Sequence, residues 1–208
     1  MIALANPETH ARRVKKCAWL NQEATQLAEF AVTLPLLVVF VVGIFDFSGA
    51  FTLKQKLTNI ARDAARAAAA DPASDLNNAL PYSVSEAFYV FDNYLLANNI
   101  NDCGIKPPKT NGQALTWQST VASTGSSACG ITFTINRGYY YPLGALSPPP
   151  AASCTPLQPA SGVTQVVSTC ISIQYSYQWR FGRVASLLGN NAILPSSISA
   201  TAVAMNAN

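Results

Sequence analysis

The apolar residues of this chain are concentrated in one long stretch near its start. The residues from Phe30 to Phe45 carry no charge, Asp46 interrupts them, and the run from Phe47 to Leu53 is again uncharged. A helix over residues 27–51 is about 37 Å long at about 1.5 Å per residue, which is enough to cross a bilayer with some tilt. The pattern therefore predicts a transmembrane helix over 27–51, with Asp46 near one membrane interface.

Two other structures share this pattern. A cleaved secretory signal would combine a basic region and an apolar run with a small-residue site at Ser48-Gly49-Ala50. Glu29 and Pro35, at the front of the apolar region, and the length of the leader speak against it. The second alternative is a buried core helix, but no other part of the chain is apolar enough to surround one. The membrane segment is the preferred interpretation.

The helical period continues beyond the apolar stretch. Apolar residues recur at spacings of three and four at Leu53, Leu57, Ile60, Ala64 and Ala68. Asp71-Pro72 should end the helix, because a residue before proline avoids the α region. We therefore expect one helix of about 44 residues, made of the membrane segment and an extension over 52–71. Its alanine-rich stripe suits close packing, either against a partner helix or against the protein's own sheet.

A second, shorter helix is predicted after this one. Ser83 and Glu86 have the spacing of a capping box, which marks a helix start. One apolar face follows, formed by Val84, Ala87, Phe88, Phe91 and Leu95. The helix should end near Asn98-Asn99.

From there the period changes to two, which indicates β-strands. Apolar and polar residues alternate over 131–136 and most clearly from Val167 to Trp179, while 114–121 and 197–205 are weaker candidates. The stretch from Gly138 to Gly162 is rich in proline and is predicted to be a long surface loop. The predicted fold is α+β: a long N-terminal transmembrane helix extended outside the membrane, a second short helix, and an antiparallel sheet with one face in water.

The distribution of charge along the chain predicts its orientation across the membrane. Thirteen Lys/Arg and ten Asp/Glu leave a net charge of +3, too small for a nucleic-acid-binding surface. Four basic residues, Arg12, Arg13, Lys15 and Lys16, precede the apolar stretch. Basic residues of this kind favour the cytoplasmic side of a membrane. The expected organisation is a cytoplasmic basic leader over 1–26, the membrane helix over 27–51, its extension over 52–71 and an extracytoplasmic α+β domain over 72–208.

The five cysteines divide in the same way. Cys17 lies before the membrane segment, and Cys103, Cys129, Cys154 and Cys170 lie after it. An even number in an oxidising compartment predicts two disulfides, with three possible connectivities. Order along the chain favours Cys103–Cys129 with Cys154–Cys170. A four-thiolate zinc site is the alternative, but the cysteines lack its usual close pairs.

Little in the chain can support catalysis. His10 is the only histidine, and it falls in the leader. A Ser–Lys pair using Lys106 or Lys109 is conceivable, but both lie in a proline-containing loop without a defining motif. The sequence has no phosphate-binding glycine loop. We expect no enzyme activity, cofactor or metal. A membrane-anchored binding module using aromatic residues is a separate possibility, and its candidates are Tyr139, Tyr140, Tyr141, Tyr175, Tyr177 and Trp179.

Several motifs resemble those of TadE-like proteins, the minor pilins or pseudopilins of bacterial tight-adherence (Flp) pili. They occur at residues 28–37, 43–47, 54–58 and 64–69, and the stretch 194–202 is similar to the family's ending. The resemblance implies a pilin-like fold and a precursor anchored in the bacterial inner membrane. It also implies a domain that acts in pilus assembly or surface adhesion, together with other pilin subunits and the assembly platform. Prepilin peptidase would cut between Ala24 and Thr25, where the family usually has glycine in place of Ala24.

Four residues of the membrane motif have physically plausible roles. A carboxylate near the membrane is costly unless it is paired, so Glu29 is a candidate functional residue. Its partner would be the new amino terminus of a neighbouring subunit, and its alternative is an interfacial position in water. Phe30 follows it in the motif. Pro35 lacks a backbone donor and should loosen the first turns of the helix, and Asp46 is expected to mark the outer interface rather than pair with Lys54 or a partner helix.

Overall fold

A computed structural model describes most of the chain. It covers residues 8–72, 74, 76–123, 129–143, 154–155, 162, 164–180 and 195–207, and for 8–24 it describes the backbone alone. The chain divides into two compact units, Met1–Asp46 and Phe47–Asn208.

The first helix is longer than expected. Helix α1 runs from Glu8 to Ala70 and passes through Pro35. The prediction that it begins near residue 27 is wrong, because the leader consists largely of Ala, Arg, Lys, Leu, Gln and Glu, which favour helix. Its end is as predicted: Ala70 is the last helical residue and Asp71-Pro72 follows.

Helix α2 spans Tyr82–Ala97 and buries the predicted apolar face. It ends at the predicted place, with Asn98 as its C-terminal cap. The predicted capping box is wrong. Pro81 is the N-cap, with a φ of −62°, and the helix therefore starts one residue before Ser83. Ser83 lies inside the first turn and is buried, so its hydroxyl is not placed to cap the helix.

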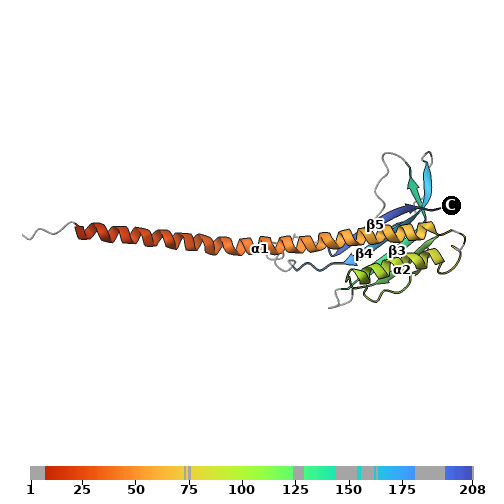
Figure 1. The fold of residues 1–208 in the computed structure, drawn as a ribbon, viewed down its shortest axis with the longest axis horizontal. Helices are drawn as coiled ribbons and strands as arrows, with labels where there is room; N and C mark the ends of the chain where they lie inside the picture. Colours follow the sequence, from red (N-terminus) through yellow and green to blue (C-terminus); the bar gives the residue numbers. More distant parts are fainter. Residues whose placement is uncertain are drawn as a thin grey trace, which may run out of the picture. The chain divides into compact units, whose positions relative to one another are not determined.

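Five antiparallel strands form one sheet in sequence order, β1-β2-β3-β4-β5 (Figure 1). The strands are β1 Lys109–Thr110, β2 Thr116–Val121, β3 Ile131–Pro142, β4 Gln165–Ser176 and β5 Ser197–Met205. The predicted α+β class is confirmed. Strand β5 has the predicted bounds, whereas β4 stops at Ser176 and does not reach Trp179. Strand β3 takes up the first residues of the predicted loop, most of which lies outside the described residues.

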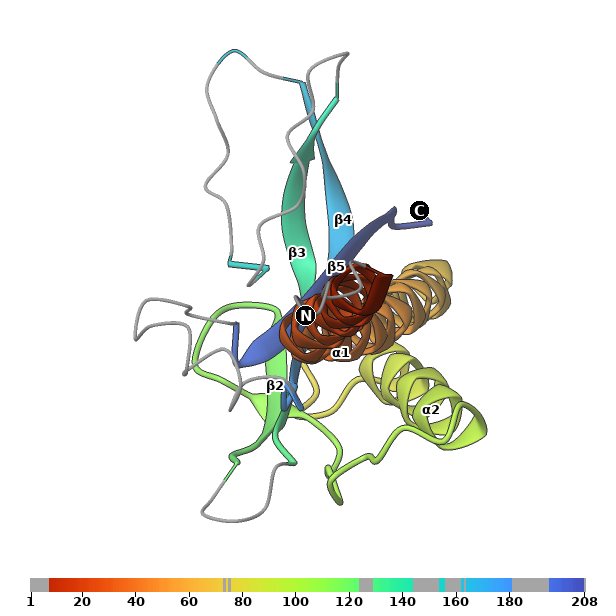
Figure 2. The same ribbon diagram turned by 90° about the vertical axis from the view of Figure 1, so that its left-hand side faces the viewer.

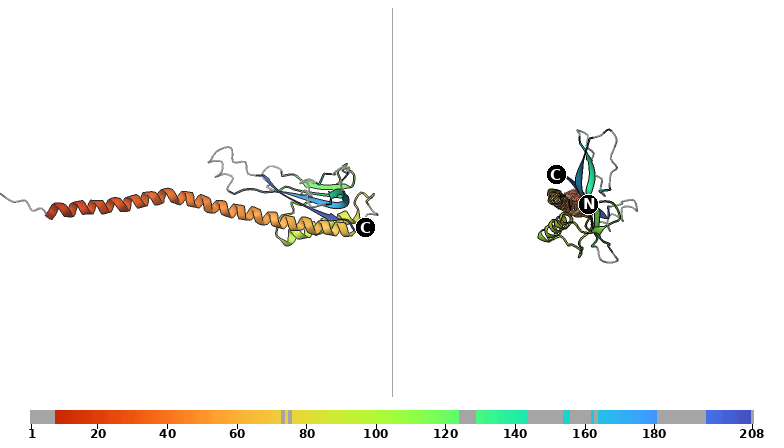
Figure 3. Two further views of the ribbon diagram at one scale, coloured as in Figure 1. Left: turned by 90° about the horizontal axis from the view of Figure 1, so that it is seen from above. Right: turned by 90° about the vertical axis from the view of Figure 1, so that its right-hand side faces the viewer.

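Both helices cover the same face of the sheet within the second unit. Figure 2 shows α2 beside α1, on the right-hand side of the strands, and from above the strands lie along one side of the Phe47–Ala70 part of α1 (Figure 3). Phe133 of β3 contacts Phe88 and Phe91 of α2, with ring centroids 5.9 and 4.6 Å apart. The alanine stripe of α1 is buried in this core. Of its two predicted partners, the protein's own sheet is therefore the one observed.

A β-bulge between Asn136 and Tyr139 changes which face of the sheet β3 presents. Ile131, Phe133 and Ile135 face the helices, whereas Tyr139 is buried in a second, smaller cluster with Cys154 and Cys170. An extra residue reverses the alternation of side chains, because the period of a strand is two. The cluster lies on the face predicted to be wet. That prediction is wrong for Ser168, Cys170 and Ser172, which are buried.

Hydrogen bonds of the Asn136 side chain stabilise the bulge. The Asn136 side chain accepts a hydrogen bond from the Gly138 amide at 2.8 Å and donates to the Cys154 carbonyl at 3.0 Å. A Cβ atom at position 138 would lie 2.7 Å from Leu115 Cδ1, so any larger residue there would require the Leu115 side chain to move.

The bulge also directs Arg137 toward the C-terminal end of α1. The guanidinium is 1% exposed and donates to the Ala68 carbonyl, to the Asp71 carbonyl at 2.9 Å and to Thr169 Oγ1 at 3.0 Å. The last turn of α1 has no basic residue of its own. Arg137 therefore supplies both the donors and the positive charge that the end of a helix lacks.

Replacement of Arg137 should destabilise the fold. Arg137→Met keeps the length of the side chain but leaves the helix-terminal carbonyls without their donors, and we expect a loss of about 2–4 kcal/mol in the free energy of unfolding. The measurement is urea denaturation of the full chain in detergent, followed by the fluorescence of the buried Trp117. Arg66→Met is the matched control: that side chain is 76% exposed on the same helix, and its change should stay within about 0.5 kcal/mol. Equal midpoints for the two variants would contradict the role of Arg137.

Candidate functional site

The apolar part of α1 is uncovered by the rest of its own unit. The described helix Thr25–Ala70 contains an 18-residue window with a mean hydropathy of 2.4, and none of that window is buried. The exposed large apolar residues are Leu27, Phe30, Val32, Leu34, Leu36, Leu37, Val38, Phe40, Val41, Val42, Ile44 and Phe45. Such a surface is stable only in lipid or against other apolar chains. By length and composition, α1 can therefore cross a membrane.

The predicted motif residues lie along this uncovered helix. Thr25, Glu29, Phe30 and Pro35 are all exposed, and Thr25 and Glu29 are four residues apart, on one helix face. The Thr33 hydroxyl donates a hydrogen bond to the Glu29 carbonyl at 3.0 Å, which is a local contact across one turn of the helix. The side chain of Ala24 lies outside the described residues. The Glu29 carboxylate is thus accessible to a partner.

Asp46, which is predicted to mark the outer interface, directly follows the last exposed apolar residues of this stretch. It is 5% exposed. Lys54, its possible partner on the same helix, donates to the Ser199 carbonyl of β5. The residue therefore sits in a covered position at the end of the apolar stretch.

The predicted disulfides are both present. Cys103–Cys129 joins the segment after α2 to the segment before β3, and Cys154–Cys170 joins β4 to the region between β3 and β4. All four sulfurs are thereby used, which leaves none of them as a zinc ligand. Among the described residues, no group of three His, Cys, Asp or Glu side chains is placed to hold a metal ion.

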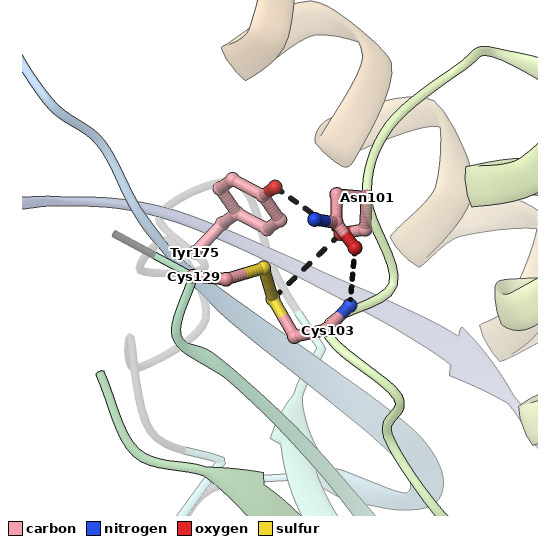
Figure 4. Close-up of a disulfide and its surroundings, with 4 residues drawn as sticks. All are labelled: Asn101, Cys103, Cys129 and Tyr175. Atoms are coloured by element: carbon pink, nitrogen blue, oxygen red, sulfur yellow. Dashed lines mark hydrogen bonds between the residues drawn. A yellow bond between two sulfur atoms is a disulfide. The ribbon is translucent and has the colours of Figure 1, made fainter. Parts of the chain in front are cut away.

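The Cys103–Cys129 disulfide is part of a small network that fixes the segment after α2 (Figure 4). The Asn101 side chain accepts a hydrogen bond from the Cys103 amide at 2.9 Å, and the Asn101 carbonyl accepts one from the Tyr175 hydroxyl at 3.1 Å. Tyr175 of β4 packs against the main core through its ring. The disulfide and Tyr175 therefore tie this segment to both strands at the same end of the sheet.

Negative charge collects beside this network. Burial raises the pKa of Asp92 on α2, and the nearby charge of Asp102 raises it further. The same two causes raise the pKa of the Tyr175 hydroxyl. One oxygen of Asp92, Oδ1, is buried without a hydrogen-bond partner. Ionised Asp92 therefore costs the folded state free energy at neutral pH.

The two remaining candidate sites are a Ser–Lys pair at Lys106 or Lys109 and a binding surface of aromatic residues. Ser119 Oγ donates to the carbonyl of Lys106 at 2.6 Å, so that contact is not a Ser–Lys catalytic pair, and Lys109 is exposed on β1. Tyr139 is buried and Tyr175 is packed against the core, which removes them from the proposed binding surface. Tyr177 and Trp179 lie beyond the end of β4.

An open hollow of about 500 Å³ lies over the end of the sheet. It is lined by the ends of β2, β3 and β4, by the start of β5 and by adjoining residues, and the described residues of this lining carry hydroxyl, amide and apolar side chains. Sequence reasoning did not find this hollow, because its residues are ordinary strand residues from four separate segments.

The fold and the exposed helix define a class of protein: an α+β domain carried on a helix that can anchor it in a membrane. The family model TadE, described as TadE-like protein, matches residues 25–66. The resemblance found in the sequence is thereby confirmed over this segment, which supports a protein associated with the Tad pilus. Neither the curated proteins nor the solved structures contain a match to the chain.

The pKa of Asp92 leads to a pH-dependent prediction. Because the pKa of the folded state is above the ordinary 3.8, the ionised carboxylate destabilises the fold above that pKa, and the cost disappears as the pH falls toward 3.8. Asp92→Asn should therefore raise the stability at pH 7 by less than about 1 kcal/mol, since the residue is only partly buried and solvent screens part of the cost. The gain over wild type should vanish below pH 4. Urea midpoints measured between pH 3 and pH 7 test this, and a less stable variant at pH 7 would contradict it.

Asp102→Asn should lower the pKa of Asp92, because the charge of Asp102 raises it. NMR titration of the Asp92 carboxyl measures this shift.

Proposed function

We propose that this protein is a non-enzymatic minor pilin or pseudopilin-like subunit that acts in tight-adherence pilus assembly or surface adhesion. One observation carries the proposal: the TadE match over 25–66 falls on a helix whose apolar side chains over 25–45 are left uncovered. A helix of this kind is suited to lie in a membrane and then to pack among the helices of neighbouring subunits. The non-enzymatic role is part of this proposal and rests on the sequence, whose single histidine, His10, lies in the leader.

The proposed location is the bacterial inner membrane, crossed once. Arg12, Arg13, Lys15 and Lys16 precede the apolar segment and favour a cytoplasmic N-terminus. The two disulfides lie after the segment and suit an oxidising compartment, which supports a domain in the periplasm or outside the cell. The expected partners are the other pilin subunits, the assembly platform and prepilin peptidase.

The proposed maturation step is cleavage between Ala24 and Thr25. It would leave Thr25 as a new amino terminus four residues before Glu29. In an apolar environment a carboxylate requires a partner. The amino terminus of one subunit and the Glu29 carboxylate of its neighbour would satisfy each other. The mature protein would retain the whole uncovered part of α1.

The first test is the intact mass and N-terminal sequence of the protein extracted from membranes. We expect a chain that begins at Thr25. Ala24→Gly, which installs the residue usual in the family, should be processed at least as completely, and Ala24→Arg should block the cut because the small residue is lost. A chain that begins at Phe51 would contradict the proposal, because it would be a secreted domain without its anchor. An uncut chain would contradict filament entry and favour a membrane-anchored binding module.

The second test concerns the Glu29 carboxylate. Glu29→Gln removes the charge with little change in shape, so an ion pair to a neighbouring amino terminus would become a neutral hydrogen bond. A hydrogen bond to a charged group contributes about 1.5–3 kcal/mol and a neutral one about 0.5–1.5 kcal/mol, so the difference of about 1–1.5 kcal/mol corresponds to about a five- to tenfold loss of subunit association. Quantitative co-purification with the other pilin subunits measures it. Glu86→Gln on α2 is the matched control, and it should leave the yield unchanged. Equal yields for the two variants would exclude the proposed ion pair.

A further inference from the structure

Aromatic side chains gather at the end of the second unit where α1 enters it. The Trp179 ring lies 5.2 Å from that of Phe47 and 5.0 Å from that of Tyr177, both edge to face. Trp179 Nε1 donates to the Pro195 carbonyl at 2.7 Å, and the Tyr177 amide donates to the Ser196 carbonyl at 3.0 Å. We call Phe47, Tyr177 and Trp179 the aromatic cluster. It is a built feature, held by backbone carbonyls from a separate segment.

The approach of α1 to this cluster is close. A Cβ atom at Gly49 would lie 3.1 Å from the Tyr177 hydroxyl, which is tighter than most such contacts. Glycine at this position therefore lets the segment after β4 lie against the helix. Much apolar surface nevertheless stays uncovered at this part of α1, since Phe47 of the cluster is 61% exposed and Phe51, one turn further along, is 64% exposed.

The position of Phe47 in the chain determines what covers this surface. Phe47 comes directly after the uncovered apolar segment and lies within the expected membrane span of 27–51. Trp179 is 132 positions further along the chain and is in ring contact with it. If the helix crosses the bilayer, the segment after β4 must therefore reach the membrane surface. Trp and Tyr are enriched at that depth, because their rings are apolar and their N–H and O–H groups are polar.

A recess beside the aromatic cluster includes one positively charged side chain, that of Arg180. A hollow of about 540 Å³ is lined by Leu53, by Asn99–Asn101 and by Tyr175–Gln178, with Cys129 and the exposed Arg180. Arginine is well suited to phosphate, since its planar guanidinium can donate two parallel hydrogen bonds. The aromatic rings and a phosphate-seeking cation thus occupy the same end of the domain.

We propose that the aromatic cluster, together with Phe51 and Arg180, is a membrane-interface anchor. The rings occupy the boundary between the acyl chains and the headgroups, and Arg180 faces the lipid phosphates. This anchor seats the base of the domain on the bilayer in addition to the helix that crosses it. The inference rests on the membrane anchoring in the proposed function.

Quenching of Trp179 by brominated lipids tests the anchor. The full chain, with Trp19→Phe to remove the tryptophan of the leader, is reconstituted in phosphatidylethanolamine–phosphatidylglycerol vesicles. The vesicles contain lipids brominated either near the headgroup end or near the methyl end of the acyl chains. The buried Trp117 remains as an internal reference for folding. We expect the bromines near the headgroup to reduce the emission more than the deep ones, and Trp179→Phe to abolish this loss.

Two added tryptophans, each in the background that lacks Trp179, separate the possible failures. Phe40→Trp reports on the apolar segment and should be quenched by the deep bromines, whereas Tyr89→Trp on the exposed face of α2 should not be quenched. Quenching at residue 40 without quenching of Trp179 would overturn the interface anchor and leave the membrane helix intact. Quenching at neither position would overturn both proposals. Equal quenching at residue 89 would overturn the assignment of the anchor to this end of the domain.

Discussion

The domain depends on one buried positive charge placed at the end of a helix. Helix α1 finishes inside the second unit, where Ala68 and Ala69 are buried and the last turn supplies no cation. Arg137 of β3 supplies both the hydrogen-bond donors and the positive charge. The Asn206 side chain accepts a hydrogen bond from the Thr169 hydroxyl at 2.5 Å and donates one to the Arg137 carbonyl at 3.2 Å. The Ala207 amide adds a bond to the Ala69 carbonyl at 2.8 Å. The helix, two central strands and the C-terminal segment thus share one polar centre, so none of them can move without leaving buried groups unsatisfied.

The bulge beside Arg137 is what gives the sheet two occupied faces. Before it, β3 presents Ile131, Phe133 and Ile135 to the helices, and after it Tyr139 turns to the opposite face. A ribbon of two strands has too little apolar surface to be stable alone. The Cys154–Cys170 disulfide and the Tyr139 ring supply a second cluster there, and Figure 2 shows β3 and β4 running on beyond the helices. The same local irregularity therefore places the helix-capping arginine and lets the sheet extend past the main core.

Local patterns in the sequence were sufficient where one interaction dominates. The apolar stretch, the helix stop at Asp71-Pro72, the face of α2 and the strand 197–205 follow from hydropathy and proline geometry, and the disulfides follow from compartment and order along the chain. The bulge could not be predicted in this way, because it needs the partner strand to define its register. Arg137 is one basic residue in a strand, and nothing local distinguishes it from a solvated one. The early start of α2 was missed because Pro81 competes with the Ser83 capping box as a helix start.

The size of the apolar side chains along α1 separates its two environments. From residue 57 onward the buried face is formed largely by alanines, at 61, 64, 65 and 68, which let the helix lie close to its own sheet. Before residue 46 the apolar residues are Leu, Val, Ile and Phe, and these are left exposed. A small-residue stripe would suit contact with a neighbouring helix, but here that stripe is already occupied by the domain. If the protein packs among pilin subunits as proposed, those contacts are expected on the large side chains around Glu29 and Phe30, where the TadE match begins, and not on the alanines where it ends.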